Sequence, residues 1–308
     1  MNTAVKAQMG AAEWTMLIAL SILWGGAFFF SEVALRGLPP FSVVFLRLAL
    51  GALALWVVFL ISVPSEKRQN LPWGAFAMMG LLNNAIPFSL LVWGQTEISS
   101  SLASIINAGT PFFTVAVAYF FLQDEKLSAV KIGGVIVGFM GILVLFGPDA
   151  LYGDTQGFWG QIACVGATVS YAFAGVFGRR FGGLPPLATA TGQVTCSTMI
   201  LLPLVLLVDQ PWALAMPGWD VWGSVIGIAI GSTTIAYILF FRILQTSGAT
   251  NVMLVTFLVP VSAIVLGTLV LGEVLLTKHV AGMALIGLGL AIIDGRPLRL
   301  FGLARSPV

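Results

Sequence analysis

Three prolines lie inside apolar stretches of the chain, each four positions after a residue with an amide or hydroxyl side chain. The pairs are Asn83 and Pro87, Asn107 and Pro111, and Thr256 and Pro260. A proline inside a helix removes one amide donor and clashes with the carbonyl four residues earlier, so that carbonyl loses its partner within the helix. The spacing predicts three kinked segments with polar groups at the kink. These groups either line a cavity or bond across a packed helix interface, and the sequence leaves both interpretations open.

Other side chains suited to binding a solute lie near the middle of apolar stretches. They are Trp24, Asn84, Trp93, Tyr171, Thr233 and Tyr237. Amides and hydroxyls bind polar groups by hydrogen bonds, and aromatic rings stack on flat or apolar ones. With Asn83, Asn107 and Thr256, these residues are candidates for a substrate-binding site. Because Trp and Tyr also anchor membrane helices at both interfaces, anchoring is the alternative role for the aromatic residues.

Arg47 is the one basic residue well inside an apolar stretch. A charged side chain in the membrane interior costs about 3 kcal/mol or more unless it is paired. Glu32 is expected at the outer end of the neighbouring first stretch, on the same side of the membrane, and is the predicted ion-pair partner of Arg47. The alternative partner of Arg47 is the carboxylate of a bound substrate. We assign Arg47 and Glu32, together with Pro87, Pro111 and Pro260, a structural or gating role.

All 12 acidic residues lie at or near the ends of apolar stretches. No carboxylate is therefore expected at the membrane centre, where one would relay protons or balance a permanently cationic substrate. We expect a neutral or zwitterionic solute. An enzyme is not expected, because the single His279 lies outside the apolar interior and no Gly-x-Ser-x-Gly motif occurs. No cofactor or metal is expected either, and Cys164 and Cys196 are interpreted as small apolar residues.

These side chains must be positioned by membrane helices. Of the 308 residues 58% are hydrophobic and only 8% are charged, whereas roughly 25% are charged in a soluble domain. The charges separate neutral stretches of the length that crosses a bilayer, about 20 residues. We predict an all-α integral membrane protein whose ten transmembrane helices lie near residues 13–33, 39–61, 71–93, 98–121, 129–147, 157–178, 185–208, 220–243, 249–271 and 277–294.

The Lys and Arg residues orient these ten spans. An even number of spans places both ends of the chain on one side. Most basic residues at or beyond the span ends fall there: Lys6, Lys67, Arg68, Lys126, Lys131, Arg179, Arg180, Arg242, Arg296, Arg299 and Arg305. Arg36 and Lys278 fall on the other side. The positive-inside rule therefore predicts cytoplasmic termini. A net charge of +2 implies no nucleic-acid partner, and the basic residues are expected to contact lipid headgroups.

The chain contains an internal repeat. A shift of 149 residues places Pro111 on Pro260 and Asp124 on Glu273, and a shift of 146 places Arg47 on Gln193. We therefore predict one membrane domain made of two repeats, residues 1–148 and 149–308, with five spans each. An odd number of spans inverts the second repeat relative to the first. In transporters of this design the substrate site lies near the membrane midplane between the repeats.

Two further predictions concern packing. The glycines of the fifth span, Gly133, Gly134, Gly138 and Gly141, indicate close contact with a neighbouring helix rather than a phosphate-binding loop. The seventh span contains Pro203 but no polar residue four positions earlier, so we predict that it is peripheral. The central cavity is accordingly expected between spans one, three, four, six, eight and nine.

Twice in the chain a proline precedes an acidic span end, and a glycine-rich span follows. Together with Trp24-Gly25-Gly26 in the first span, this pattern resembles the drug/metabolite transporter superfamily, and within it the EamA-type ten-helix members. The resemblance covers nearly the whole chain. It implies a carrier that works by alternating access in the bacterial inner membrane and exports amino acids or related metabolites, as YddG-type members do. One departure is that residues 17–30 lack the acidic residue that small multidrug members carry.

Other functions remain open on the sequence alone. A passive facilitator or channel, a carrier of nucleotide sugars or other metabolites, and a membrane scaffold would share the same helices. The expected partners are a small-molecule substrate and membrane lipids. The sequence does not determine the oligomeric state, and a single chain of ten spans is sufficient for the predicted cavity.

Overall fold

The computed structural model describes residues 9–122, 128–147 and 157–295, and in these ranges it consists of helices and their connections. Some residues named above lie outside these ranges, namely Lys6, Asp124, Lys126, Arg296, Arg299 and Arg305. In the described part of the chain, nine helical segments are long and apolar enough to cross a membrane, and Val255–Val270 is a shorter apolar helix. The predicted all-α fold with ten membrane helices is confirmed.

Half of the spans are single helices and half consist of consecutive pieces. The single helices are α1 (Ala11–Ala34), α2 (Pro40–Ser62), α7 (Ala129–Phe146), α12 (Val255–Val270) and α13 (Thr277–Asp294). The composite spans are α3 (Trp73–Gly80) with η2 (Leu81–Ala85) and α4 (Ile86–Gly94); α5 (Ser100–Asn107) with α6 (Thr110–Phe121); α8 (Phe158–Gly178) with η4 (Arg179–Phe181); α9 (Pro186–Leu204) with η5 (Val205–Asp209); and α10 (Trp219–Ile226) with η7 (Gly227–Ile235) and α11 (Ala236–Val252). Short turns η1 (Ser65–Arg68) and η6 (Pro211–Ala213) lie in connections.

The predicted span boundaries agree with the structure except around the eighth and ninth spans. The eighth apolar segment continues to Gly248 rather than to residue 243, and α12 begins at Val255 rather than at 249. Gly248 has φ 79° and interrupts α11. A positive φ is accessible to glycine at little cost, so the chain turns there without a proline or a charge to signal it.

The third and eighth spans each contain a π-helical segment. In η2 the wider turn allows the amide of Ile86 to donate to the carbonyl of Leu81, directly before Pro87, which has no amide to donate. The segment η7 occupies the middle of the eighth span. Single π turns inside α-helices occur frequently at functional sites. Both segments bring polar residues toward the centre of the bundle, as described below.

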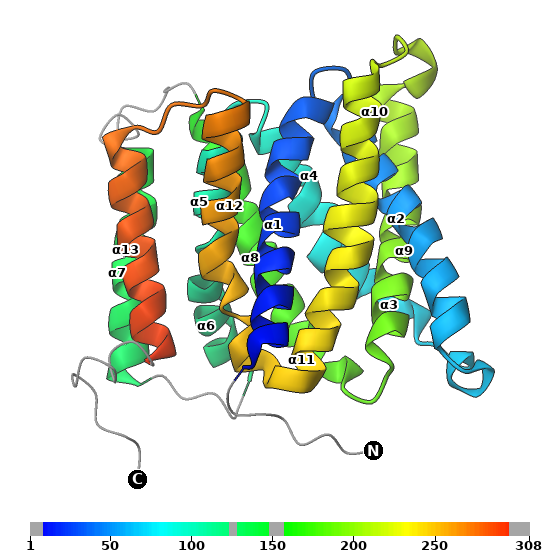
Figure 1. Ribbon diagram of the computed structural model, residues 1–308, viewed down its shortest axis with the longest axis horizontal. Helices are drawn as coiled ribbons and strands as arrows, with labels where there is room; N and C mark the ends of the chain where they lie inside the picture. The colour runs from blue at the N-terminus through cyan, green and yellow to red at the C-terminus, as the bar shows by residue number, and fades with distance from the viewer. Residues whose placement is uncertain (1–8, 123–127, 148–156, 296–308) are drawn as a thin grey trace.

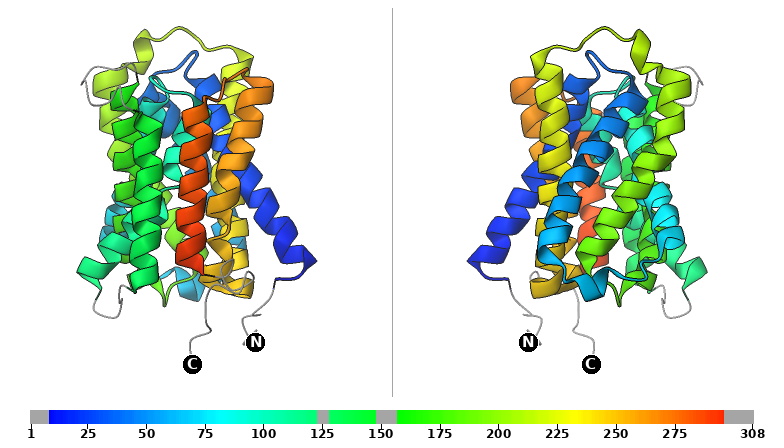
Figure 2. Two further views of the ribbon diagram at one scale, coloured as in Figure 1. Left: turned by 90° about the vertical axis from the view of Figure 1, so that its left-hand side faces the viewer. Right: turned by 90° about the vertical axis from the view of Figure 1, so that its right-hand side faces the viewer.

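The spans lie roughly along one direction, with α7 and α13 side by side at one edge and α2, α3 and α9 at the other (Figure 1). Both side views in Figure 2 agree that α1 begins and α13 ends at the same end of the bundle. We call this end the termini side and the opposite end the distal side. Within the bundle α1 packs against α12, and α8 packs against α5 and α6.

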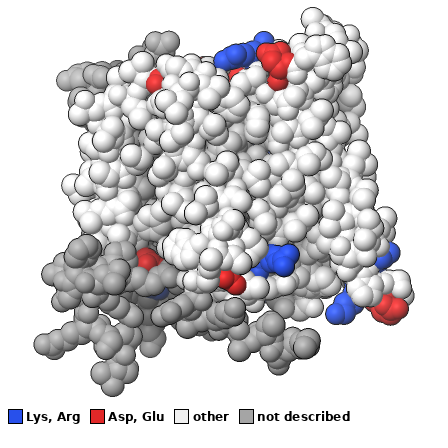
Figure 3. All heavy atoms as spheres, in the orientation of Figure 1, with Lys and Arg blue, Asp and Glu red and all other residues white. Residues whose placement is uncertain are grey.

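The surface divides into charged ends and an uncharged middle. On the face drawn in Figure 3, the Lys, Arg, Asp and Glu side chains gather near the two ends, and a broad band between them carries none. Exposed apolar residues cover this band; on α2 they recur one helical turn apart, at Leu53, Val57 and Ile61. An uncharged apolar band of this kind is what the hydrocarbon core of a bilayer requires.

Glycines allow α7 and α13 to approach closely. A side chain added at Gly134 would meet the carbonyl of Gly289 at 2.8 Å, and one added at Gly141 would meet the carbonyl of Gly282 at 2.8 Å. Gly138 packs against Phe112. The predicted close packing is thus confirmed for three of the four glycines. It is wrong for Gly133, which has no neighbour within 4 Å because it lies on another face of the helix.

Candidate solute-binding cavity

A cavity of about 660 Å³ lies in the centre of the bundle. Its walls come from eight of the ten spans, and of the residues described in α7 and α13 none contributes. Cavities of roughly 300–1,000 Å³ hold most small-molecule ligands. The volume is therefore sufficient for a molecule of metabolite size.

The cavity opens on the termini side and is closed on the distal side. At the termini side it is bordered by exposed residues, among them Gly182 and Met253. Its other end is formed by Ser31 and Gln95, which are 2% and 4% exposed. Gln95 Nε2 donates to the carbonyl of Phe28 at 2.8 Å and lies 3.4 Å from Glu32 Oε2. These contacts join α1 to the end of α4 and seal the distal end.

Two carboxylates hold helix beginnings at the distal side. Glu273 accepts hydrogen bonds from the amides of Ser100 and Ser101 at 2.8 and 3.0 Å, and from both hydroxyls. Asp209 Oδ2 accepts from the amide and the hydroxyl of Ser42 at 2.6 and 2.8 Å. A carboxylate is favoured at a helix N-terminus, where unpaired amides and the helix dipole present positive charge. The first contact joins α5 to the chain after α12, and the second joins α2 to η5.

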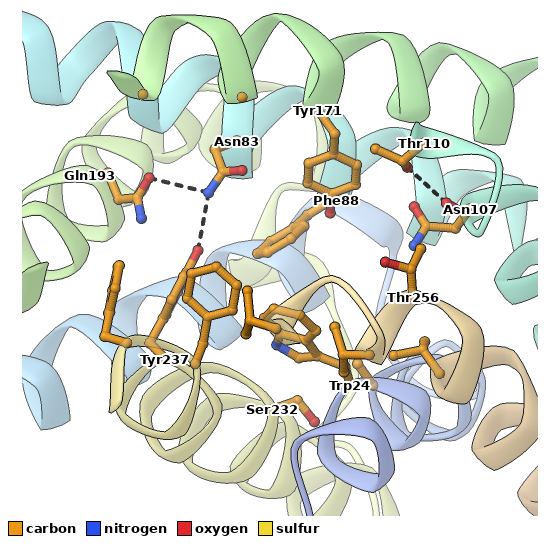
Figure 4. A pocket seen from close by; sticks show the side chains of 18 of the residues that line it. Trp24, Asn83, Phe88, Asn107, Thr110, Tyr171, Gln193, Ser232, Tyr237 and Thr256 are labelled. Atoms are coloured by element: carbon orange, nitrogen blue, oxygen red, sulfur yellow. Dashed lines mark hydrogen bonds between the residues drawn. The ribbon is translucent and has the colours of Figure 1, made fainter. Parts of the chain in front are cut away.

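A hydrogen-bond network crosses the cavity wall near η2. Asn83 Nδ2 lies 3.2 Å from Gln193 Oε1 and 3.3 Å from the hydroxyl of Tyr237 (Figure 4). Asn84 Nδ2 donates to the same hydroxyl at 3.0 Å. Asn83, Gln193 and Tyr237 line the cavity, whereas Asn84 is fully buried behind them. The π turn in η2 places two consecutive asparagines within reach of one hydroxyl.

The break between α5 and α6 forms a second polar part of the wall. Pro111 interrupts the span as predicted, and the hydroxyl of Thr110 donates to the carbonyl of Asn107 at 2.7 Å. The freed carbonyl is thus satisfied locally. The side-chain oxygen of Asn107 is buried without a partner in the described structure, and the Asn107 side chain lies beside Thr256 (Figure 4). Asn107 therefore lines the cavity with an amide whose buried oxygen has no protein partner in the described structure.

Arg47 also lines the cavity, but its environment differs from the prediction. Its Nε donates to Thr233 Oγ1 at 3.0 Å, and its guanidinium carbon lies 3.7 Å from the centroid of the Phe88 ring. The predicted ion pair with Glu32 is not formed, because Glu32 is held beside Gln95 on the distal side. Among the residues that the structure describes, no carboxylate lies within ion-pair distance of Arg47.

The structure brings most of the predicted site residues to one cavity. Those that line it are Trp24, Arg47, Asn83, Asn107, Tyr171, Tyr237, Thr256 and Pro260. Asn84 and Thr233 lie behind the wall and support Tyr237 and Arg47. Glu32, Pro87 and Pro111 are not part of the lining, and Trp93 faces the outside of the bundle.

The prediction that the seventh span is peripheral is wrong. The cavity is lined by Pro186, Thr189 and Gln193 of α9. The second span, which was also not expected at the cavity, contributes Arg47. Pro203 was a poor guide because it lies near the end of α9, whereas the lining residues lie in its first half. The 146-residue shift between the halves of the sequence was the better indicator, because the two residues that it pairs, Arg47 and Gln193, both line the cavity.

Comparison with known proteins identifies relatives over nearly the whole chain. The model of the EamA-like transporter family matches residues 13–147 and again residues 158–294. The chain is 27% identical over 285 residues to an uncharacterized transporter of Archaeoglobus fulgidus, covering 91% of this chain and 98% of the relative. It is 27% identical over 300 residues to the inner membrane transporter YedA of Escherichia coli K12, covering 92% of each.

The fold is also shared with a solved protein. One crystal structure superposes with a TM-score of 0.67 over 95% of this chain and 99% of the other, at 19% sequence identity. At this identity the likeness concerns the fold alone. It agrees with the helical architecture described above.

Proposed function

Because this chain belongs to the EamA-like transporter family, a family of multi-pass membrane transporters of small molecules, we propose that it exports amino acids or related neutral or zwitterionic metabolites by alternating access. The observation that carries this proposal is the central cavity, lined from eight spans, open on the termini side and sealed on the distal side. A carrier that opens to one side at a time requires such a cavity.

Two inverted repeats would allow the carrier to adopt a second conformation, in which the cavity opens to the distal side. The proposal of a first repeat over residues 1–148 and a second over 149–308 draws support from the two separate matches to the family model, one in each half. The π segments η2 and η7 lie at corresponding places in the two halves, and the fifth and tenth spans, α7 and α13, pack against each other. Exchanging the conformations of two such repeats would close the termini side and open the distal side.

The direction of transport follows from the orientation we propose. The positive-inside rule places the termini side in the cytoplasm, and the relative YedA is named as an inner membrane transporter. With the same location for this chain, the cavity would receive its solute from the cytoplasm. This arrangement is the loading state of an exporter.

The chemistry of the walls favours a neutral or zwitterionic solute with an apolar part. No aspartate or glutamate occurs among the described residues that line the cavity. Amides are supplied by Asn83, Asn107 and Gln193, and a hydroxyl by Tyr237. Rings are supplied by Trp24 and Phe240, whose centroids lie 5.5 Å apart. A solute that is only a cation would find no opposite charge there.

Uptake of radiolabelled amino acids into proteoliposomes tests the proposal. The purified chain should give uptake above that of empty liposomes for at least one amino acid with an apolar side chain. Asn83→Ala should reduce this uptake roughly tenfold, the effect of about 1.4 kcal/mol and within reach of one or two lost hydrogen bonds. Gln69→Ala, at an exposed residue in a connection, is the matched control. Transport of a nucleotide sugar without transport of any amino acid would refute the substrate class.

A further inference from the structure

Arg47 is a buried cation that borders a cavity and has no anionic partner in the described structure. It is 7% exposed, and its hydrogen bond to Thr233 uses one of the five N–H groups of the guanidinium. The four N–H groups on the two terminal nitrogens have no protein acceptor among the described residues. Neutral contacts with Thr233 and Phe88 offset only part of the desolvation of a full charge.

We propose that the terminal nitrogens of Arg47 bind the carboxylate of the transported solute, so that the substrates are carboxylate-bearing molecules with an apolar or aromatic body. The inference rests on the proposed function and specifies its substrate class. A guanidinium presents parallel N–H groups that match a carboxylate in a bidentate pair. The solute would thus supply the charge that the protein itself does not place beside Arg47.

The surroundings of Arg47 complete an anion site. Tyr171 and Tyr237 line the same cavity as Arg47, and the ring of Tyr171 packs against Phe88, the ring on which the guanidinium lies, with centroids 6.5 Å apart. The hydroxyl of Tyr237 already accepts from Asn83 and Asn84, so its own hydrogen remains to be donated. The hydroxyl of Tyr171 has no hydrogen-bond partner in the described structure and points toward the cavity (Figure 4). Two hydroxyls, each with a hydrogen to donate, therefore line the same cavity as the guanidinium.

The position of the guanidinium is fixed from behind. Phe88 lies against it at 3.7 Å, and Thr233 holds Nε at 3.0 Å. Thr233 in turn donates to the carbonyl of Ile228 at 3.1 Å within η7. Because these contacts use the Nε edge and one face of the guanidinium, the terminal nitrogens are left for a ligand. A site whose donors are held in place before binding loses little entropy on capturing its ligand.

A carboxylate fits this site better than a phosphate. Arg47 is the only charged residue described in the interior of the cavity, and the other charged lining residue, Arg179, lies at the exposed termini side and already has an interaction. One positive charge balances a carboxylate, whereas a phosphate monoester would retain an uncompensated charge in a site walled by Phe28, Phe88 and Phe240.

Equilibrium binding to the full chain in detergent tests the inference with three probes of similar shape. They are 3-phenylpropanoate, its uncharged isostere 3-phenylpropanamide, and phenyl phosphate. We expect the carboxylate to bind at least tenfold more tightly than the amide and the phosphate. Equal affinity for acid and amide, tighter binding of the phosphate, or no detectable binding of the acid at millimolar concentration would each overturn the inference.

Variants assign the preference to Arg47. In Arg47→Gln the preference for acid over amide should disappear, and Arg47→Lys should keep a reduced preference because the charge remains but the bidentate geometry is lost. Arg242→Gln removes an exposed cation outside the cavity and should leave the preference unchanged. An acid preference that persists in Arg47→Gln would contradict the assignment. The wild-type probe comparison stands without any variant, should Arg47→Gln fail to fold.

The outcome is separable from that of the proposed function. Transport of amino acids in proteoliposomes combined with equal binding of acid and amide would leave the exporter intact and reject the carboxylate site. Acid-selective binding without transport of any amino acid would support the carboxylate site and reject the amino-acid exporter.

Discussion

Glu273 accepts hydrogen bonds from both the backbone amide and the hydroxyl of Ser100, at 2.8 and 2.6 Å. The two residues are 173 positions apart. Ser100 begins α5 in the first half of the chain, and Glu273 follows α12 in the second half. The contact therefore joins the two halves on the distal side, where the cavity is closed. We expect it to stabilise the state that is open on the termini side.

Glu273→Gln should open the distal side. A hydrogen bond to a charged group contributes about 1.5–3 kcal/mol, and a change of 2 kcal/mol shifts the ratio of two states roughly 30-fold. Ser31→Cys, at the sealed end of the cavity, is the reporter, in a background with Cys164 and Cys196 replaced by alanine. A membrane-impermeant maleimide added on the distal side should modify the reporter markedly faster in Glu273→Gln.

Glu66→Gln is the control for this change, because Glu66 is an exposed carboxylate in η1 on the termini side. It should leave the labelling rate unaltered. If Glu273→Gln and Glu66→Gln give the same distal labelling as the parent, the Glu273 contact does not hold the cavity closed.

Gly134→Ala should destabilise the protein, and Gly133→Ala should not. A Cβ at Gly134 would lie 2.7 Å from Ile293 Cγ1 and 2.8 Å from the carbonyl of Gly289, whereas one at Gly133 meets nothing within 4 Å. Overpacking of this kind costs roughly 1–3 kcal/mol. Thermal unfolding in detergent should show a lower midpoint for the Gly134 variant alone. Equal midpoints for the two variants would mean that α7 and α13 do not pack as described.

Tyr237→Phe should lower both stability and solute affinity. The hydroxyl is the acceptor for Asn84 Nδ2, and Asn84 is fully buried, so its amide would lose its hydrogen bond. A buried unsatisfied donor costs about 1–3 kcal/mol. Thermal unfolding measures the first effect, and KM for uptake measures the second. Tyr119→Phe removes a hydroxyl from a half-exposed ring on α6 and should change neither quantity. Identical behaviour of both variants would argue against the network.

The membrane helices follow from the sequence because their signal is local. Neutral stretches bounded by charges predict spans whatever their neighbours are, and even the tenth span, between Lys278 and Asp294, was found in this way. The boundary at Gly248 was missed because a single glycine with positive φ leaves no mark in hydropathy. The π segments η2 and η7 were also missed, since they depend on how each helix and its neighbours satisfy the backbone.

The cavity is less evident because its residues come from eight separate spans. Prolines and mid-span amides predicted Asn83, Asn107 and Thr256, which lie at the cavity. They did not predict Gln95, which seals the distal end, because an amide near a span end looks like an ordinary interfacial residue. The partner of Arg47 was also assigned wrongly. Glu32 lies at the distal end of the neighbouring helix α1, but only the three-dimensional packing shows that Gln95 lies beside it.

Counterflow in proteoliposomes tests most directly whether the cavity serves a carrier. Liposomes containing the protein are preloaded with an unlabelled transported amino acid and diluted into a trace of the labelled one. A carrier with alternating access should accumulate label transiently above its equilibrium level, because outward movement of unlabelled solute drives inward movement of label through the same cavity. Label that rises only to equilibrium, together with conduction at single-channel rates, would contradict alternating access and indicate a channel.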